Sequence, residues 1–322
     1  MTKTTVVIPN YNGMAYLQDC LESLSKQAYS FDTIVVDNGS QDGSCSFIKE
    51  HFPKVALISL PENLGFCRAV NIGIKATKTP YVLLLNNDVK VEADFVKNLE
   101  HALEKKKDYF SIGAKMVSMK EPEQMDDAGD FYCALGWAFA RGKGRPEKDY
   151  QKSGQVFSAC AGAAIYRRQV FQEIGYFDEN HFAYLEDVDI GYRAKIFGYK
   201  NGFCHKAVVL HAGSGFSGSR YNEFKVTLSS RNSMYVIGKN MPFLQIFLNA
   251  PLLLAGIFIK WIFFTRKSMG KIYIQGIMKG IYGYLTKVRK EKKVPFQMKH
   301  FKNYCRIQME LWGNLLIFLR NA

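Results

Sequence analysis

The sequence predicts an α/β fold, built as a doubly wound, mostly parallel sheet with a C-terminal amphipathic helical extension. Over most of the chain, short β-branched runs alternate with helical periodicity, which is typical of parallel sheets covered by helices on both faces. Asn, Asp and Gly follow the predicted strands. A third observation, an apolar but strongly basic segment after residue 240, predicts the extension.

Thr5-Val-Val-Ile8 is predicted to open the sheet, because a β-branched run there ends at Pro9. Leu17, Leu21 and Leu24 then recur at helical spacing, so a helix follows this strand. The helices are expected at 16–26, 44–51, 65–76, 92–105, 170–175 and 188–197. The strands after the first are expected at 33–36, 55–59, 81–85 and 207–210.

Residues 118–155 interrupt this alternation. Gly129, Gly136, Gly142 and Gly144 lie there among aromatic side chains that include Trp137. Long connections inside compact domains are uncommon and often functional. The segment is therefore either a substrate-binding loop or a surface excursion, and composition favours neither.

The segment after 240 carries most of the charge. Residues 260–322 hold 14 basic and 2 acidic residues, so +12 of the net charge of +14 lies there. Aromatic and aliphatic residues are interleaved with these charges, as in helices that bind anionic membrane surfaces and unlike nucleic-acid-binding arms.

The most apolar stretch, 244–264, approaches the length of a membrane span. However, Gln245, Asn249, Gly256 and Lys260 share one narrow helical face. Such a polar seam favours a helix lying in the membrane interface or packed on the protein over a lone span. Amphipathic segments over 269–288 and at the end of the chain extend the same region.

Seven scattered cysteines without a C-x-x-C pair predict reduced thiols rather than a disulfide framework or zinc site. Only Met1-Thr-Lys-Thr4 precedes the first strand, which leaves no room for a signal peptide. We therefore expect a cytoplasmic protein, associated peripherally with the inner face of the cell membrane through residues 241–322.

Ligands of open parallel sheets bind at the carboxyl ends of the strands. Here those ends carry Pro9-Asn-Tyr-Asn12, Asp37-Asn-Gly-Ser40, Asn86-Asn-Asp88 and His211. Each segment alone is an ordinary turn, but their coincidence at one edge predicts a site. The sequence contains neither the glycine-rich dinucleotide-binding fingerprint nor a P-loop, so no such loop would bind a diphosphate. The charge of a bound diphosphate would therefore need a metal, for which Asp88 and His211 are candidate ligands.

Glu186, Asp187 and Asp189 form a second acidic group. Acids are favoured in the first turn of a helix, which is a structural explanation for all three. Asp189 also has Arg193 at i+4, and Glu186 faces Asp189 at i+3. Asp187 has no such partner, so it is the best candidate for a general base.

The chain resembles family 2 glycosyltransferases of the inverting, GT-A type, and within them the rhamnosyltransferase-like enzymes of bacterial surface polysaccharide synthesis. The similarity covers roughly residues 5–235. The matching segments are Val6-Val-Ile-Pro-Asn-Tyr-Asn12, Ile34-Val-Val-Asp-Asn-Gly-Ser40, Asn63-Leu-Gly-Phe66, Tyr81-Val-Leu-Leu-Leu-Asn-Asn-Asp88, Cys160-Ala-Gly-Ala163, Ile174-Gly-Tyr-Phe-Asp-Glu179 and Phe182-Ala-Tyr-Leu-Glu-Asp-Val-Asp189.

The resemblance implies a role for each matched residue. Asp187 would deprotonate the acceptor hydroxyl, and Asp88 with His211 would hold a divalent metal, Mn²⁺ or Mg²⁺, on the diphosphate. The implied donor-binding residues are Pro9, Asn12, Asp37, Asn63, Gly65, Asn71 and Asn87. The residues expected to support the acceptor site or the local structure are Glu186, Asp189, Arg193 and Trp137.

One departure qualifies the resemblance, and one absence separates the chain from processive relatives. The family's metal motif is often Asp-x-Asp, whereas this chain has Asn86-Asn87-Asp88, and Asn86 is a weaker ligand for a hard cation. Processive relatives carry Q-x-x-R-W and several spanning helices, neither of which occurs in the sequence. We therefore expect transfer of one sugar per binding event.

The expected organisation is a GT-A catalytic domain over 1–240, with a nucleotide-sugar half at 1–115 and an acceptor half at 116–240, followed by the membrane-association region at 241–322. The expected reaction moves one sugar from dTDP-rhamnose or a UDP-sugar to a hydroxyl of a glycan or polyprenyl-linked acceptor. The alternative is an inactive glycan-binding or scaffold protein. A sugar-1-phosphate nucleotidyltransferase fits less well, because Pro9-Asn-Tyr-Asn12 is not the glycine-rich basic loop of that class.

Overall fold

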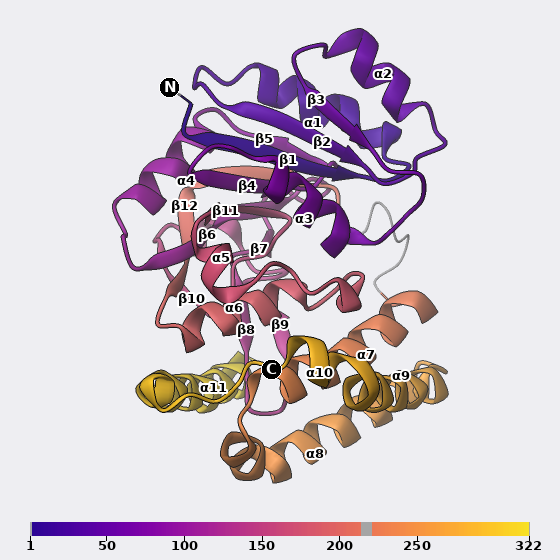
Figure 1. Ribbon diagram of the computed structural model, residues 1–322, viewed down its shortest axis with the longest axis vertical. Helices are drawn as coiled ribbons and strands as arrows, with labels where there is room; N and C mark the ends of the chain where they lie inside the picture. Colours follow the sequence, from indigo (N-terminus) through magenta and orange to yellow (C-terminus); the bar gives the residue numbers. More distant parts are fainter. Residues whose placement is uncertain (1, 214–220, 322) are drawn as a thin grey trace.

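A ten-stranded mixed sheet forms the centre of the computed structural model, which describes residues 2–213 and 221–321. The main strand order is β10-β12-β6-β11-β4-β1-β2-β3, with β5 paired to β12 and β7 to β6. Helices α7 to α11 gather in a layer away from the β1–β3 end of the sheet (Figure 1). The predicted fold class, a mostly parallel α/β sheet with C-terminal helices, is confirmed.

The strands of the sheet are β1 (Thr4–Asn10), β2 (Asp32–Asp37), β3 (Ala56–Ser59), β4 (Tyr81–Leu85), β5 (Val89–Val91), β6 (Tyr109–Ser118), β7 (Met125–Asp127), β10 (Gly154–Val156), β11 (Ala163–Arg167) and β12 (Lys200–His211). A separate hairpin pairs β8 (Asp130–Tyr132) with β9 (Ala138–Ala140). The α-helices are α1 (Met14–Ser25), α2 (Ser44–His51), α3 (Phe66–Ala76), α4 (Phe95–Glu104), α5 (Val170–Ile174), α6 (Glu186–Ile196), α7 (Glu223–Asn240), α8 (Phe243–Thr265), α9 (Gly270–Gly283), α10 (Arg289–Lys292) and α11 (Phe301–Asn321). A π-helical turn (Tyr284–Val288) follows α9, and short 3₁₀ turns lie at Glu147–Asp149, Glu179–His181 and Met298–His300.

Strands β3, β2, β1 and β4 are parallel neighbours, as the alternating sequence pattern predicted. Successive side chains of a strand point to opposite faces. Val6 and Ile8 accordingly pack in the same core as Leu17 of α1, whereas Val7 packs with Val70 of α3 in a second core. Both faces of the sheet are therefore buried, which explains the continuous apolar run in β1.

The other half of the sheet was only partly predicted. Strand β11 runs antiparallel between β4 and β6, and β12 extends over twelve residues where the sequence predicted only 207–210. Buried polar residues hide the pattern of these strands: Lys115 in β6 and Asn201 in β12 are both at most 1% exposed. The expected loop over 118–155 contains β7, β8, β9 and β10, so it is neither a single loop nor an irregular excursion.

The C-terminal helices are packed on the rest of the protein. Leu311 of α11 is fully buried in one core with Val188 and Tyr192 of α6 and with Tyr132 of β8. Lys195 of α6 is ion-paired with Glu310 at 2.9 Å. Ending the chain at residue 240 would therefore uncover part of the core.

Helix α8 turns its predicted polar seam toward the protein. Gln245 and Asn249 are at most 4% exposed, and Asn249 exchanges two hydrogen bonds with Gln308 of α11. The opposite face carries exposed side chains such as Phe247 and Leu254, at 67% and 68% exposure. By length and composition, α8 is the one helix within residues 2–213 and 221–321 that could cross a membrane.

Candidate active site

The carboxyl ends of β1 and β2 are tied together by side-chain hydrogen bonds. Asn10 Nδ2 donates to Asp37 Oδ1 at 2.8 Å, and the Ser40 N–H donates to Asp37 Oδ2 at 2.9 Å. Asp37 is 1% exposed, and both of its carboxylate oxygens accept hydrogen bonds from residues of these loops. At its neighbour, the Asn38 amide donates to Asn63 Oδ1 at 2.9 Å. These contacts hold the polar edge in a fixed shape.

Asn12, Asn63 and Gly65, three predicted donor-binding residues, shape the loops at this edge. Asn12 has φ +47° and its Oδ1 accepts the Gln41 N–H at 2.8 Å. Asn63 Oδ1 also accepts the Gly65 N–H at 3.0 Å. Gly65 has φ +86°, and a Cβ there would collide with the Phe182 ring at 2.6 Å. Glycine is therefore required where the chain passes the segment that precedes α6.

Of the other donor-binding candidates, Asn71 is engaged within the protein and Asn87 and Pro9 lie at the edge. Asn71 is 2% exposed, its Nδ2 donates to Phe177 O at 2.8 Å, and its Oδ1 accepts the Phe177 N–H. It therefore fastens α3 to the chain before α6. Asn87 Nδ2 donates to Asn10 Oδ1 at 2.7 Å, and both Asn87 and Pro9 are partly exposed.

Asp88 and His211, the two predicted metal ligands, come together although 123 positions separate them in the numbering. His211 Nε2 lies 3.3 Å from Asp88 Oδ1, and His211 Nδ1 lies 2.7 Å from Asp126 Oδ2. Burial lowers the pKa of His211, but the hydrogen bond to Asp126 and the nearby Asp88 carboxylate raise it to about 9. Burial raises the pKa of Asp126, and His211 and Lys143 outweigh this and lower it to about 2.

The residues at this point fit a divalent cation. Asp88 Oδ1 is buried, and its nearest polar neighbour among the described residues is His211 Nε2 at 3.3 Å, whose proton a cation would have to displace. Asp126 holds the other nitrogen of His211, the usual arrangement of a carboxylate behind a metal-binding imidazole. Within residues 2–213 and 221–321, no three His, Cys, Asp or Glu side chains form a ready metal cage. A cation here would need further ligands from a bound nucleotide.

Asp187 lies in the first turn of α6, after a constrained stretch of backbone. Tyr184 and Leu185 have φ values of +70° and +65°, which are unusual for residues with side chains. The Val188 N–H donates to Asp187 Oδ1 at 2.7 Å, and residue Asp187 is partly exposed. Burial raises the pKa of Asp187 to about 6 despite the hydrogen bonds to Val188 and Asp130. Asp187 has no salt bridge in the part of the chain that the structure describes, as the sequence suggested.

Three further acids surround Asp187. Burial and the Asp187 charge raise the pKa of Glu186 to about 8, and Glu186 Oε2 finds no hydrogen-bond partner among residues 2–213 and 221–321. Burial raises the pKa of Asp127 to about 7, with further contributions from Asp126 and Asp187. Burial and Asp187 raise the pKa of Asp130 well above its ordinary value. Because Asp126 adjoins Asp127, one short segment links the Asp88–His211 pair to the Asp187 group.

Sequence reasoning did not single out Asp126, Asp127 and Asp130. They form Asp126-Asp-Ala-Gly-Asp130, three acids within five positions of an aromatic segment. The repulsion argument that drew attention to residues 186–189 applies equally here and could have found them. Gly129 supplies the turn: it has φ +94° and its N–H donates to Asp127 Oδ1 at 2.6 Å.

Asp189 is a structural acid, and its predicted pairing with Arg193 is present at 3.0 Å. The sequence did not reveal its second partner, Lys239 of α7, whose Nζ lies 2.8 Å from both Asp189 and Asp178. Burial raises the pKa of Asp189, but Lys239 and Arg193 hold it well below its usual range. Arg193 also donates to the carbonyls of Ile174, Gly175 and Tyr176.

Trp137 lies in the turn of the β8–β9 hairpin and contacts the C-terminal helices. Its Nε1 donates to Gly256 O of α8 at 3.2 Å, and its ring meets that of Phe318 edge-on. Asp130 begins β8, so the two ends of one hairpin contact the acidic group and α8.

The family model described as glycosyl transferase family 2 matches residues 5–175, more than half of the chain. The chain belongs to this family. It is 28% identical over 235 residues to the N-acetylglucosaminyl-diphospho-decaprenol L-rhamnosyltransferase of Mycobacterium tuberculosis, covering 64% of this chain and 75% of the relative. It is 25% identical over 218 residues to the O-antigen chain rhamnosyltransferase RfbN of Salmonella typhimurium, covering 65% and 66% of the two chains.

Solved structures support the GT-A fold. The mannosyltransferase PcManGT from Pyrobaculum calidifontis, in complex with GDP-Man and Mn²⁺, has a TM-score of 0.56 at 14% identity and covers 87% of both chains. GalNAc-T7 with UDP, GalNAc and Mn²⁺ has a TM-score of 0.59 at 17% identity, covering 74% of this chain. The match spans 48% of the GalNAc-T7 chain. This family 2 glycosyltransferase thus has rhamnosyltransferases among its relatives, and the predicted family is confirmed.

Proposed function

We propose that this glycosyltransferase inverts the anomeric centre of a nucleotide-diphosphate sugar and transfers one sugar per binding event, with Asp187 as the general base. One observation carries the proposal: residue Asp187 is partly exposed with its pKa raised to about 6, while its neighbour Asp189 is engaged by Arg193 and Lys239. A base works best when its pKa lies near the working pH. Asp189 is neutralised by Lys239 and Arg193, which leaves it unsuited to this role.

In the proposed reaction, Asp187 takes the proton of an acceptor hydroxyl. The hydroxyl oxygen forms its bond to the anomeric carbon as the bond from that carbon to the diphosphate oxygen breaks. Attack on the face opposite the leaving group inverts the configuration. Base catalysis of this kind contributes roughly 10²–10⁴-fold.

Asp88 and His211 would hold the divalent cation, with Asp126 fixing the imidazole from behind. Such a cation, Mn²⁺ or Mg²⁺, would neutralise charge on the departing diphosphate. Support comes from the buried Asp88 oxygen, which makes no well-directed hydrogen bond to the described residues, and from two structural neighbours that contain Mn²⁺. With two protein ligands, the nucleotide phosphates would complete the coordination, a mode common for Mg²⁺.

The donor would be dTDP-rhamnose or a UDP-sugar, bound at the edge formed by Asp37, Asn12, Asn87 and the Asn63–Gly65 turn. The acceptor would be a glycan or a polyprenyl-linked sugar of cell-surface polysaccharide synthesis, as the names of the two rhamnosyltransferase relatives suggest. In this division, residues 1–115 bind the donor and 116–240 the acceptor.

Residues 241–322 would hold the enzyme on the cytoplasmic face of the membrane. Support comes from the outward face of α8, where Phe243, Phe247 and Leu254 are each more than 60% exposed, and from the +12 charge of the region after residue 259. Exposed apolar side chains beside basic residues bind anionic lipid surfaces. The inward polar seam of α8 favours a helix lying along the surface over one that crosses the bilayer.

Asp187→Asn tests the catalytic assignment. We expect kcat to fall roughly 10²–10⁴-fold while donor affinity stays within about twofold, because the amide keeps the size of the side chain but cannot take a proton. Asp32→Asn removes an exposed carboxylate of β2 and should leave kcat unchanged. Transfer would be measured with dTDP-rhamnose and UDP-sugars on a lipid-linked acceptor. Unchanged turnover in Asp187→Asn would remove Asp187 as the base, and wild type that transfers none of these sugars would favour an inactive binding protein.

Leu254→Glu with Phe258→Glu tests the membrane assignment. Both side chains are more than half exposed, so folding should tolerate the change while flotation with phosphatidylglycerol vesicles falls severalfold. Gln172→Glu, at an exposed position of α5, adds the same kind of charge elsewhere as a control. Equal flotation of all variants would refute membrane contact through α8.

A further inference from the structure

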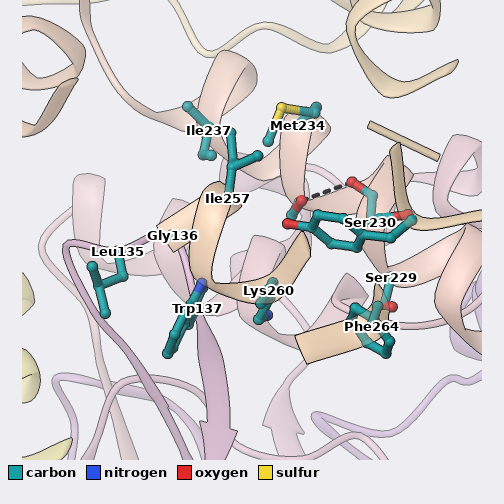
Figure 2. A pocket seen from close by; sticks show the side chains of 12 residues that line it. Leu135, Gly136, Trp137, Ser229, Ser230, Met234, Ile237, Ile257, Lys260 and Phe264 are labelled. Carbon is teal, nitrogen blue, oxygen red and sulfur yellow. Dashed lines mark hydrogen bonds between the residues drawn. The ribbon is translucent and has the colours of Figure 1, made fainter. Parts of the chain in front are cut away.

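A pocket opens between the hairpin turn and helices α7, α8 and α9 (Figure 2). The space inside it that can hold water-sized groups is about 50 Å³, and about 390 Å³ when the open mouth is included. Trp137 and Leu135 come from the hairpin, Ser229 from α7, Lys260 and Phe264 from α8, and Tyr273 from α9. Its walls expose apolar and polar groups in similar amounts, so it offers both packing and hydrogen bonds to a ligand.

Lys260 is the charged group of this pocket. Its Nζ lies 5.2 Å from the centre of the Trp137 ring, and no carboxylate lies within ion-pair distance of it among the described residues. Burial lowers the pKa of Lys260 to about 8. A partly buried ammonium with an aromatic face but no counter-ion is incompletely compensated, and an anion would supply the missing charge.

Other hydrogen-bond donors of the pocket are available to an anion. The Tyr273 side chain is 4% exposed, and no hydrogen bond of its hydroxyl is found within residues 2–213 and 221–321. Ser229 Oγ makes only a long contact, 3.4 Å, with Val226 O, so its hydroxyl can turn at little cost. An ammonium and two hydroxyls are the donors that phosphate oxygens accept.

The pocket also lies beside the proposed membrane face. Lys260 belongs to α8, whose neighbouring side chains Phe258, Ile259 and Trp261 are 40–55% exposed. A lipid chain could therefore remain in the apolar layer while its phosphate enters the pocket. Along the hairpin, Asp130 and Leu135 are five residues apart, which an extended strand spans in at most about 17 Å. The pocket is thus within the length of a lipid-linked sugar from the acidic group.

We propose that this pocket binds the phosphate group of a membrane lipid, and that its ligand is the diphosphate of a polyprenyl-linked acceptor, held by Lys260, Ser229 and Tyr273. The choice of acceptor over a phospholipid headgroup rests on the proposed function, whereas the phosphate site itself does not. Trp137 lines this site, which gives it a role in acceptor binding.

Binding of geranyl diphosphate to the full-length protein tests the site, measured by calorimetry with excess UDP present to fill the donor edge. Lys260→Met keeps the length of the side chain and removes its charge, and we expect affinity to fall at least tenfold. Lys271→Met, at an exposed position of α9, removes the same charge outside the pocket and should change affinity less than twofold. Melting temperature would confirm that both variants fold. Equal losses in the two variants, or none in Lys260→Met, would overturn the site.

Two further arms separate the ligand sources and the two proposals. If geranyl diphosphate binding depends on Lys260 and flotation with phosphatidylglycerol vesicles does not, the acceptor assignment is supported. If only the flotation depends on Lys260, the pocket takes a headgroup and the acceptor assignment is wrong. Hydrolysis of the nucleotide-sugar donor should be unchanged in Lys260→Met, so a protein that binds geranyl diphosphate but turns over no donor would refute the proposed function alone.

Discussion

Removing the charge of Lys239 should destabilise the protein and disturb the start of α6. The Nζ is 1% exposed and lies 2.8 Å from Asp178 and from Asp189, both at most 2% exposed. Hydrogen bonds to charged groups contribute about 1.5–3 kcal/mol each, and breaking a buried ion pair costs about 3–5 kcal/mol. Because Arg193 still neutralises Asp189, we expect Lys239→Met to lower the free energy of unfolding by about 4 kcal/mol and the melting temperature by roughly 8 °C.

The pH dependence of this loss identifies its cause. Burial opposes ionisation of Asp178 and Asp189, but Lys239 outweighs it and keeps both pKa values below the unfolded value. This contribution is present above the unfolded pKa, near 4, and disappears as the pH falls through the folded values. In urea unfolding, the free energy of unfolding of Lys239→Met should therefore lie well below that of wild type at pH 7, and this gap should narrow toward pH 3. Lys279→Met, at an exposed position, is the control. A gap below about 1 kcal/mol at pH 7, or one independent of pH, would refute the reasoning.

Two other predictions concern the base and the hairpin contact. Since the pKa of Asp187 is raised to about 6 and the base must be ionised, kcat/KM should rise about tenfold per pH unit below pH 6 and level off above it. A pH–rate profile that is flat from pH 5 to 7 would exclude this group. A Cβ at Gly256 would press against the Leu135 carbonyl oxygen and Trp137, so Gly256→Ala should lower stability by about 1–3 kcal/mol and change tryptophan fluorescence. Gly313→Ala in α11 meets no atom within 4 Å and should be neutral or slightly stabilising, so an equal loss in both would point to a general effect of the helix layer.

The parallel half of the sheet was predictable because its strands follow one rule. Val6, Val7 and Ile8 are all fully buried, so the sequence shows an uninterrupted apolar run bounded by turn residues. Strand β6 breaks this rule, since Ser111 and Lys115 are buried with specific partners, Asn201 and Glu147. From sequence alone, both polar residues are expected to be exposed, because the partners that allow their burial are distant in the sequence.

The candidate site was predictable to the extent that local spacing determines it. The Asp189–Arg193 pair follows from one helical turn, and it is present. The contact between His211 and Asp88 depended on two strand ends reaching one edge, and the structure brings them to 3.3 Å. Lys239 could not be assigned to Asp189, because 50 residues, including strand β12, separate them. Only tertiary packing determines which buried acid pairs with the Lys239 ammonium.

Helix α8 turns its polar face toward the protein and its apolar face outward, and this limits how the protein could contact a bilayer. If α8 left the protein to cross the membrane, Gln245 and Asn249 would lose their hydrogen bonds to Tyr192 and Gln308 and would enter hydrocarbon together with the Lys260 ammonium, each at a cost of several kcal/mol. Under the proposed membrane contact, the helix would therefore stay in one leaflet. Since the β8–β9 hairpin joins α8 to the acidic group, its length would then set the height of that group above the lipid surface. Such an enzyme would be selective for acceptor length: it would act on sugars held at one distance from the membrane and not on shorter or longer acceptor glycans.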